Sequence, residues 1–380
     1  MRTQLSRREW LKTGAAAVTG WLAGPNLTAA ASRFLDWGFE TKGALRLLYN
    51  ESHFGISEAA RKAIMDSLSE CSAYPDDRYG ELKDQIATRE KLQPENIILG
   101  AGSIEIITAA LHAYSLRGDV LSSDPTYSDY VDYAAKAYSR LHMVPLTTEF
   151  GLDHKAIEKK ADSHIGLVYL CNPQHPTGAL TPHLHLRPFC RKVSREALVV
   201  LDEAYCDYVE DQAYASMVDL VREGENVLVT RTFSKIHGLA GLRIGYGLAR
   251  ADIIKNLMQQ ERNFAPVSSL SLRAAIASYQ DEEFVQKVRR QNRDVRSYVY
   301  RELERLGFAF IPSHTNFVIF KVRADSRELA KRLEERSIYV SPFKFRGANW
   351  IRVSLGTLEE MRAFVAHLEE VGDEDTTRYS

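Results

Sequence analysis

Short apolar runs bounded by glycine and proline recur along the chain. They are rich in Val, Ile and Leu, and they comprise residues 97–99, 120–122, 165–171, 197–201 and 227–232. Continuous apolar runs of this length predict strands that are buried on both faces. Segments of helical period, such as residues 104–114, lie between them. The alternation predicts an α/β fold with a mainly parallel sheet flanked by helices.

The last third of the chain departs from this alternation. A helical pattern covers about residues 267–306, and residues 308–311 and 316–322 read as strands. Thr357 and Glu360 then form a capping-box pattern that begins the final helix. We therefore predict a smaller α+β domain after the large one. The predicted division is an export signal (1–31), an arm with part of the small domain (32–75), the large domain (76–266), a connecting helix with the C-terminal small domain (267–372) and a frayed tail (373–380).

Residues 1–31 resemble a twin-arginine export signal. Arg7 and Arg8 are paired, Trp10 follows, and a weakly apolar stretch leads to a run of small residues at 29–31. The apolar stretch is shorter than the roughly 20 residues that span a bilayer, so we expect no stable membrane span after cleavage. We expect a protein that is exported folded, to the periplasm, or that stays cytoplasmic if the signal does not function. The alternative is an amphipathic helix with two chance arginines.

Composition narrows the class of partner. The 380 residues carry a net charge of −1 without a Lys/Arg-rich block, which argues against nucleic acid and favours small-molecule chemistry. The cysteines, Cys71, Cys171, Cys190 and Cys206, have no CxxC pairing and no metal-ligand spacing. We expect unpaired, mostly buried thiols and no metal site.

One lysine lies at the mouth of the strand predicted for residues 227–232. Ser234 and Lys235 follow that strand directly, and Arg243 comes shortly after, inside what reads as a second apolar strand. Open α/β sheets bind ligands at the carboxyl ends of their strands. A lysine that can form a Schiff base, with a hydroxyl and an arginine for a phosphate, suggests pyridoxal phosphate. The alternative is a surface lysine and an arginine in an ordinary ion pair.

Other strand ends carry polar or aromatic residues. The turn formed by Ala101, Gly102 and Ser103 opens a helix, and such a turn offers backbone N–H groups to a phosphate. Tyr127 follows another strand, where its ring could stack on a ligand or belong to the core. Asp202 ends a buried strand beside Glu203, and this acidic pair could also bind a metal or cap a helix.

Eight motifs in a fixed order resemble one enzyme family. They are YP, AGSIEII, DPTY, CNPxxPTG, LDEAY, TFSKxxGLAGLRIGY, TNF and IRVSLGT, and together they cover nearly all of residues 48–368. The chain resembles the fold-type-I pyridoxal-phosphate aminotransferases of class I/II, and within them the histidinol-phosphate aminotransferase branch. This resemblance implies a seven-stranded, mainly parallel sheet in the large domain and a homodimer.

The resemblance also implies a role for each matching residue. Lys235 would hold the cofactor as a Schiff base and act as the general base, and Asp202 would pair with the ring nitrogen. Tyr127 would stack on the ring, and Arg352 would bind the substrate carboxylate. Tyr205 and His175 would reach the ring oxygen, with His175 also close to the substrate. The phosphate ligands would be the turn at Ala101, Gly102 and Ser103 together with Thr232, Ser234, Arg243 and, from a neighbouring subunit, Tyr74.

Three positions depart from the family pattern. His175 stands where the family has asparagine, and Ser52 and His53 replace an aromatic residue or asparagine followed by proline. Ser341 replaces the arginine that helps histidinol-phosphate enzymes to bind the substrate's phosphate. This argues against a phosphorylated substrate, although Lys344 or Arg346 are alternative cations for the same task.

We therefore expect a transaminase that exchanges an amino group between an L-amino acid and a 2-keto acid. A decarboxylase or a C–S lyase is the alternative on the same fold, because the cofactor decides only that a bond at Cα breaks. A non-catalytic binding protein is a further alternative, and a regulator would need a DNA-binding domain that we do not find in the sequence.

Overall fold

The structure is a computed structural model that describes residues 43–75, 78–127, 139–260 and 267–377. The predicted export signal, the start of the predicted arm, residues 128–138 and residues 378–380 lie outside the described residues. From Leu45 onward the chain forms one compact unit. Within the described residues, no helix combines the length and apolarity that a membrane crossing requires.

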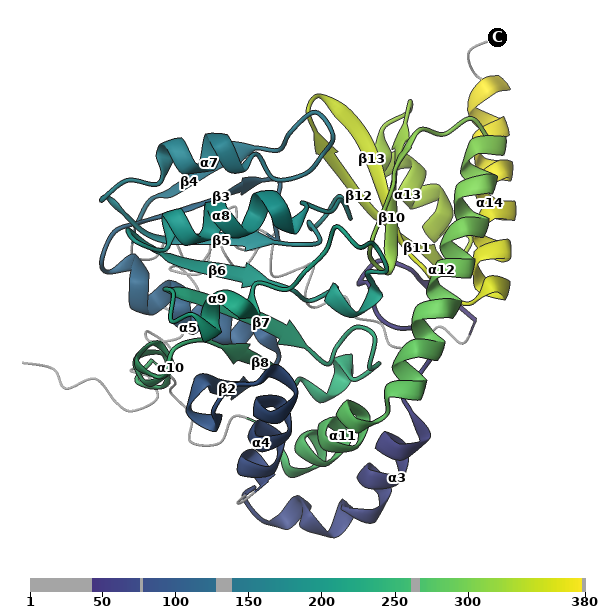
Figure 1. The fold of residues 1–380 in the computed structure, drawn as a ribbon. Coiled ribbons are helices and arrows are strands. Elements are labelled where there is room, and N and C mark those ends of the chain that lie inside the picture. The colour runs from purple at the N-terminus through teal and green to yellow at the C-terminus, as the bar shows by residue number, and fades with distance from the viewer. Residues whose placement is uncertain (1–42, 76–77, 128–138, 261–266, 378–380) are drawn as a thin grey trace, which may run out of the picture. The chain divides into compact units, whose positions relative to one another are not determined.

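The larger sheet of this unit has seven strands (Figure 1). Their order is β2-β8-β7-β6-β5-β3-β4, and every neighbouring pair is parallel except the two pairs that contain β8. The bounds are β2 (Ile97–Gly100), β3 (Asp119–Asp124), β4 (Leu141–Pro145), β5 (Ile165–Cys171), β6 (Leu198–Asp202), β7 (Val227–Thr232) and β8 (Gly245–Leu248). This topology confirms the predicted mainly parallel α/β sheet.

Helices cover both faces of this sheet, which is why its central strands β5 and β6 are almost continuously apolar. Val168 and Leu170 of β5 face one apolar cluster, whereas Leu167 and Tyr169 face the other. The first cluster is formed with α3 (Glu58–Asp66), α4 (Arg78–Glu90), α7 (His154–Lys160), α8 (His183–Val193), α9 (Val218–Arg222) and α11 (Ser269–Gln280). The second is formed with α5 (Ser103–Ser115) and α10 (Ala251–Met258).

A smaller antiparallel sheet has the order β12-β13-β10-β9, and β1 pairs with β11 in parallel beside it. The bounds are β1 (Leu45–Arg46), β9 (Phe310–Ile311), β10 (Phe317–Val322), β11 (Ile338–Tyr339), β12 (Ser341–Phe345) and β13 (Ala348–Ser354). One face of the four-stranded sheet packs on α12 (Glu282–Arg305), α13 (Ser326–Glu334) and α14 (Leu358–Thr377). Its other face meets Tyr205 and Ile236, which follow strands of the larger sheet.

Two predicted elements have different bounds. The helical pattern at residues 267–306 is divided into α11 and α12 at Asp281, whose carboxylate accepts a hydrogen bond from the N–H of Phe284 and so begins a new helix. At the C-terminus, α14 continues past residue 372, where a frayed tail was predicted, as far as Thr377. The capping box of α14 is present, with Glu360 accepting from the N–H of Thr357 at 2.6 Å.

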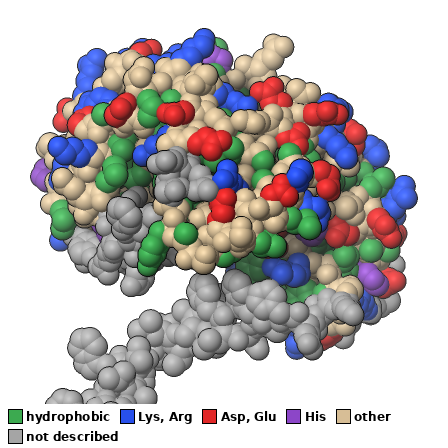
Figure 2. All heavy atoms as spheres, turned by 90° about the horizontal axis from the view of Figure 1, so that it is seen from below, with side chains coloured by type: hydrophobic (Ala, Val, Ile, Leu, Met, Phe, Trp, Pro, Cys, Tyr) green, Lys and Arg blue, Asp and Glu red, His purple; other side chains and the backbone are tan. Residues whose placement is uncertain are grey.

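The charged surface is mixed. On the face shown in Figure 2, Lys and Arg side chains lie interspersed with Asp and Glu over the described residues, in keeping with the net charge of −1. The thiols are unpaired, and Cys171 and Cys190 are buried whereas Cys71 is exposed.

Candidate active site

Lys235 follows β7 and is half-buried between the two sheets. Its ammonium group donates to the backbone carbonyls of Tyr49 and Asn50, at 3.2 and 3.0 Å. Burial and, after it, the positive charge of Arg352 together lower the pKa of Lys235 to about 8. A substantial share of the amine is therefore neutral at mildly alkaline pH, which is the form that attacks a carbonyl carbon.

Asn50 positions the arm against this lysine, and the sequence analysis missed its role. Its φ of 55° is in the left-handed region, which asparagine tolerates. Its side-chain amide donates to the hydroxyl of Tyr205 at 3.1 Å, and its backbone carbonyl accepts from the side-chain amide of Asn316 at 3.0 Å. Asn50 thus joins the arm to both sheets next to Lys235.

Asp202 ends β6 and is buried. Its Oδ2 accepts from the hydroxyl of Tyr169 at 3.1 Å, and its Oδ1 accepts from the N–H of Ala204 at 3.1 Å and from Thr230 at 3.4 Å. Burial raises the pKa of Asp202 to about 6. The side chain is thus a carboxylate at neutral pH in an environment that favours a positively charged partner.

Glu203, the second acid at this strand end, has a structural role. Its carboxylate lies 3.1 Å from Arg231, which also contacts Glu90 at 2.7 Å. It accepts from the N–H of Met217 as well, at 2.8 Å. The pair therefore does not act together at one site. Among the described residues, no group of three or more His, Cys, Asp or Glu is arranged to hold a metal ion.

His175 and Arg352 are in direct contact. A guanidinium N–H of Arg352 donates to Nε2 of His175 at 2.5 Å, so the imidazole hydrogen must be on Nδ1. Burial and, to a smaller extent, the positive charges of Arg352 and Lys235 lower the pKa of His175 well below its usual value. The imidazole ring is therefore neutral. Nδ1 is buried and has no hydrogen-bond partner among the described residues. A buried donor of this kind is costly unless a ligand satisfies it.

Two tyrosines and a phenylalanine surround His175. The ring of Tyr205 is nearly parallel to His175, with centroids 6.5 Å apart, and Tyr127 makes an edge contact at 5.3 Å. Burial raises the pKa of Tyr205, so its hydroxyl is a donor. The guanidinium of Arg352 also lies 5.7 Å from the centroid of the Phe317 ring and donates to the carbonyl of Leu48 at 2.7 Å.

The predicted phosphate residues gather at the start of α5. Gly102 has a φ of 82°, and a Cβ there would lie 2.4 Å from the guanidinium of Arg243, so only glycine allows this approach. Arg243 also lies 3.3 Å from the hydroxyl of Ser234, which in turn accepts from Thr232 at 3.0 Å. Hydroxyls, a guanidinium and a helix N-terminus together form a cradle suited to an anion.

Two details of this cradle differ from expectation. Arg243 is not inside a strand: it ends the 3-10 turn η4 (Ala240–Leu242) with a φ of 51°, a left-handed conformation that a strand does not accommodate. In the turn, the N–H of Ala101 donates to the carboxylate of Glu105 at 2.6 Å, and that of Gly102 donates to Gly100. The turn's remaining predicted backbone donor is Ser103, the first residue of α5.

Tyr74 is a predicted site residue that a single chain leaves at the surface. It is 87% exposed and follows the 3-10 helix η1 (Leu68–Ser72). The other predicted residues are brought together around Lys235.

These residues suit pyridoxal phosphate on three counts. A lysine of lowered pKa is present for the Schiff base, a buried carboxylate for the ring nitrogen, and an anion cradle for the phosphate. The unsatisfied Nδ1 of His175 adds a donor for an oxygen of the ring. When bound, this cofactor supplies an electron sink for the negative charge that forms at the substrate's Cα.

The fold and this constellation define the class of fold-type-I pyridoxal-phosphate enzymes. Residues 43–368 match the family model "Aminotransferase class I and II", and the chain belongs to that family. It is therefore a pyridoxal-phosphate-dependent aminotransferase.

Individual relatives support this assignment. The chain is 35% identical to the histidinol-phosphate aminotransferase of Moorella thermoacetica, over 87% of this chain and 86% of the relative. It is 33% identical to histidinol-phosphate aminotransferase 1 of Cupriavidus pinatubonensis, over 93% and 94% of the two chains. The solved histidinol-phosphate aminotransferase of Sinorhizobium meliloti, in complex with pyridoxal-5'-phosphate, superposes with a TM-score of 0.81 at 28% identity, covering 87% of this chain and 91% of the other.

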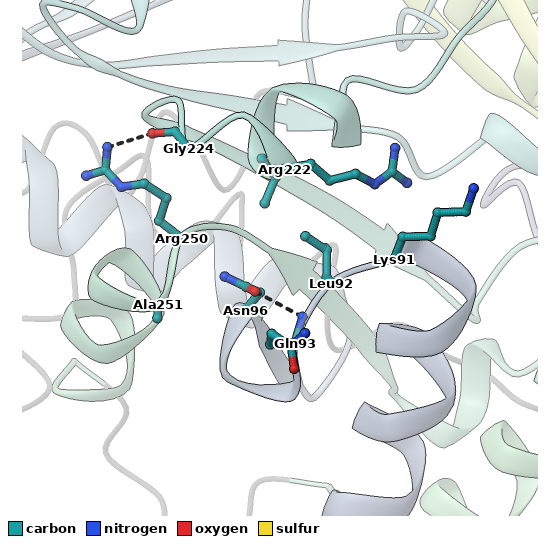
Figure 3. Close-up of a pocket in the computed structure, with 9 residues that line it drawn as sticks. Lys91, Leu92, Gln93, Asn96, Arg222, Gly224, Arg250 and Ala251 are labelled. Carbon is teal, nitrogen blue, oxygen red and sulfur yellow. Dashed lines mark hydrogen bonds between the residues drawn. The ribbon is translucent and has the colours of Figure 1, made fainter.

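A surface hollow of about 320 Å³ is separate from these residues (Figure 3). Its lining includes Arg222 and Arg250, which could attract an anion. However, Arg250 already binds Asp252 and the carbonyl of Gly224, and Arg222 already binds Asp219. The charges of both arginines are thus compensated within the chain, and we assign no ligand to this hollow.

Proposed function

We propose that this aminotransferase transfers an α-amino group from an L-amino acid to a 2-keto acid, and that the side chain of the amino acid carries no phosphate. Arg352 would grip the α-carboxylate with its planar guanidinium, beside the amine of Lys235. The observation that carries the proposal is the contact of Arg352 with His175, an imidazole that also feels the charge of Lys235.

The proposed roles follow from these positions. Lys235 would hold the cofactor covalently and, once released from it, its Nζ would take the proton from the substrate's Cα and return it to the cofactor. Asp202 would keep the ring nitrogen protonated. The cradle of Ser103, Ser234 and Arg243 would bind the phosphate.

The environment of Ser341 supports a substrate without a phosphate. The β12–β13 register pairs Ser341 with Arg352, so the two side chains share one face of the sheet. The histidinol-phosphate branch has an arginine at this position. Of the two alternative cations, Lys344 is paired with Asp325 at 2.9 Å, and Arg346 donates to the carbonyl of Thr147 at 2.7 Å. Neither therefore replaces the missing arginine.

A half-reaction screen across amino acids tests this function. Purified enzyme is mixed with each candidate, and keto acid, carbon dioxide and ammonia are assayed separately. We expect keto acid without carbon dioxide or ammonia. Carbon dioxide as the main product would instead indicate a decarboxylase, and ammonia a lyase.

A pair of variants at position 341 tests the substrate class. Ser341→Arg should lower the KM for a phosphorylated amine such as histidinol phosphate by roughly tenfold or more, because it adds a charge-assisted hydrogen bond. Ser341→Ala is the matched control and should leave that KM unchanged. An efficient wild-type reaction with the phosphorylated amine would contradict the proposed class.

We also propose that the enzyme is a homodimer in which Tyr74 contributes to the phosphate site of the neighbouring subunit. The exposure of Tyr74 and its YP motif support this proposal. Tyr49, Met65 and Leu68 are exposed apolar residues of the same N-terminal part of the chain and would also be covered in a dimer.

Finally, we propose export through the twin-arginine route, supported by the paired Arg7 and Arg8 and the apolar stretch after them. That route carries folded proteins, so the cofactor can be loaded before export. Fractionation of cells that produce the full chain tests this: replacement of both arginines by lysine should retain the protein in the cytoplasm, whereas an unchanged distribution would refute it.

A further inference from the structure

Tyr169 is a fully buried tyrosine of β5 that the predicted site does not include. Its hydroxyl lies 3.1 Å from Oδ2 of Asp202 and 3.3 Å from Sγ of Cys171. The β5–β6 register pairs Cys171 with Asp202, and Tyr169 comes two residues before Cys171. The three side chains therefore share one face of the sheet, and their contact follows from the strand pairing.

The hydrogens in this row can be assigned one by one. Tyr169 has a single hydroxyl hydrogen, which the ionised Asp202 must receive because a carboxylate only accepts. The thiol of Cys171 then donates to the oxygen of Tyr169, and Thr126, 4.0 Å from the sulfur, can donate to the thiol. Burial raises the pKa of Tyr169 well above its usual value and that of Cys171 to about 12, so both groups keep their hydrogens.

The two oxygens of Asp202 are not equivalent. Oδ1 accepts from both Ala204 and Thr230, whereas among the described residues Oδ2 accepts from Tyr169. A carboxylate oxygen has two acceptor positions. Oδ2 therefore keeps one position for a donor from a ligand, and the hydroxyl of Tyr169 fixes the direction in which that position points.

We propose that Tyr169 is a positioning residue of the enzyme: its hydroxyl keeps Asp202 ionised and turns Oδ2 toward the ring nitrogen of the cofactor. Tyr169 need not touch the cofactor or the substrate, and it acts through Asp202. This inference rests on the cofactor site and is independent of which amino acid is the substrate.

The other groups around Asp202 do not replace this effect. Tyr205, after β6, and Cys171, at the end of β5, both stay protonated because burial raises their pKa values. They are therefore uncharged and supply no positive charge that would keep Asp202 ionised. Lys235, after β7, favours the ionised form of Asp202 through its positive charge. The hydrogen bond from Tyr169 lowers the pKa of Asp202 more than this charge does. Loss of the hydroxyl should therefore raise the pKa of Asp202 further above its present value of about 6.

The variant Tyr169→Phe removes the hydroxyl and keeps the ring. We expect kcat to fall roughly 10- to 100-fold while the KM for the amino acid changes little, since a hydrogen bond to a charged group is lost at the ring nitrogen and not at Arg352. The acid limb of the kcat/KM profile should move up by about one pH unit. With cofactor that carries nitrogen-15 in its ring, the NMR signal of the resting enzyme should move toward the unprotonated position.

Tyr114→Phe is the matched control. Tyr114 is buried in the same apolar cluster, in α5, and its carbonyl lies against Gly166 near the start of β5, whereas Tyr169 contacts Asp202 toward the other end of that strand. The Tyr114→Phe variant should leave the acid limb of the kcat/KM profile and the nitrogen signal unchanged. A smaller shift of both in the same direction is expected for Cys171→Ala, which removes the donor to Tyr169.

A Tyr169→Phe enzyme that binds the cofactor and has the wild-type nitrogen signal and acid limb would overturn the proposal. If Tyr169→Phe does not fold, the decision passes to Cys171→Ala, for which an unchanged nitrogen signal would overturn it. A wild-type protein that does not bind pyridoxal phosphate would instead contradict the proposed function itself, so the two failures are distinguishable.

Discussion

At the residue scale, the guanidinium of Arg352 donates both to His175 and to the carbonyl of Leu48. The carbonyl and the imidazole fix its plane, which supports the proposed bidentate grip on a carboxylate. A charge alone would not reproduce this geometry.

The change Arg352→Lys tests that argument. It keeps the charge but loses the planar fork, so the KM for the amino acid should rise roughly 10- to 100-fold while cofactor affinity changes little. Steady-state kinetics and a cofactor titration measure the two effects. Arg323→Ala, an exposed arginine just after β10, is the control and should change neither. An unchanged KM in Arg352→Lys would mean that the carboxylate is bound elsewhere.

The pKa of Asp202 predicts a pH dependence of cofactor affinity. Because burial raises that pKa to about 6, the carboxylate is lost as the pH falls through about 6, and with it the pairing to a protonated ring nitrogen. Affinity for the apo-protein should therefore be full above this pH and fall below it. Equilibrium titrations between about pH 5 and 8 measure the effect.

The cofactor's phosphate also titrates near pH 6, so a control is needed. Asp202→Asn keeps the contribution of the phosphate and removes that of the carboxylate. The wild-type curve should be steeper than the Asn curve. Parallel curves would show that Asp202 does not titrate in this range.

At the scale of the element, the start of α5 depends on the backbone of Gly102. Its φ of 82° and ψ of 164° belong to a region that only glycine populates readily. The close approach of Arg243 adds a second reason, since a methyl group at this position would displace the guanidinium.

Gly102→Ala should therefore weaken cofactor binding by roughly tenfold or more, through backbone strain and the displaced guanidinium. Cofactor titration and thermal unfolding of the apo-protein separate the effect on the site from that on the fold. Gly224→Ala is the control: it also has a positive φ but open space around its Cβ, so it should cost stability without changing cofactor affinity.

Elements whose patterns are continuous could be predicted from the sequence. The strands β5 and β7 occupy the residues of the apolar runs at 165–171 and 227–232, because a strand buried on both faces needs an uninterrupted run. The grouping of Lys235 and Asp202 was predictable for a related reason, since the parallel strands β6 and β7 end at one edge of the sheet.

Other features were hidden for physical reasons. Tyr169 lies within an apolar run, where its hydroxyl carries no signal, and its contact with Asp202 depends on a strand pairing that no local pattern encodes. Asn50 acts across more than 150 residues, on Tyr205. Arg243 was expected within a strand because the residues around it are apolar, but its left-handed conformation results from the preceding turn.

At the scale of the whole molecule, the proposed sharing of Tyr74 between subunits can be tested by mixing two variants. Lys235→Ala should abolish activity, and Tyr74→Ala should reduce cofactor affinity about tenfold by loss of a phosphate contact. In a mixed dimer, the site with Lys235 receives an intact Tyr74 from the other subunit.

Reassorted mixtures of the two variants should therefore recover about a quarter of the wild-type activity at low cofactor concentration, since half of the dimers are mixed and each has one complete site. Lys235→Ala mixed with itself is the control. No recovery, or a fully active monomer in sedimentation experiments, would exclude the shared site.

The two backbone carbonyls that accept hydrogen bonds from Lys235 belong to the N-terminal arm. The arm is also bonded to Asn316, next to the smaller sheet, and to Tyr205, next to the larger one. The ammonium ion is thus held by main-chain oxygens whose position both sheets help to fix. A substitution at either anchor, Asn316 or Tyr205, should therefore also change the proton affinity of the Lys235 amine.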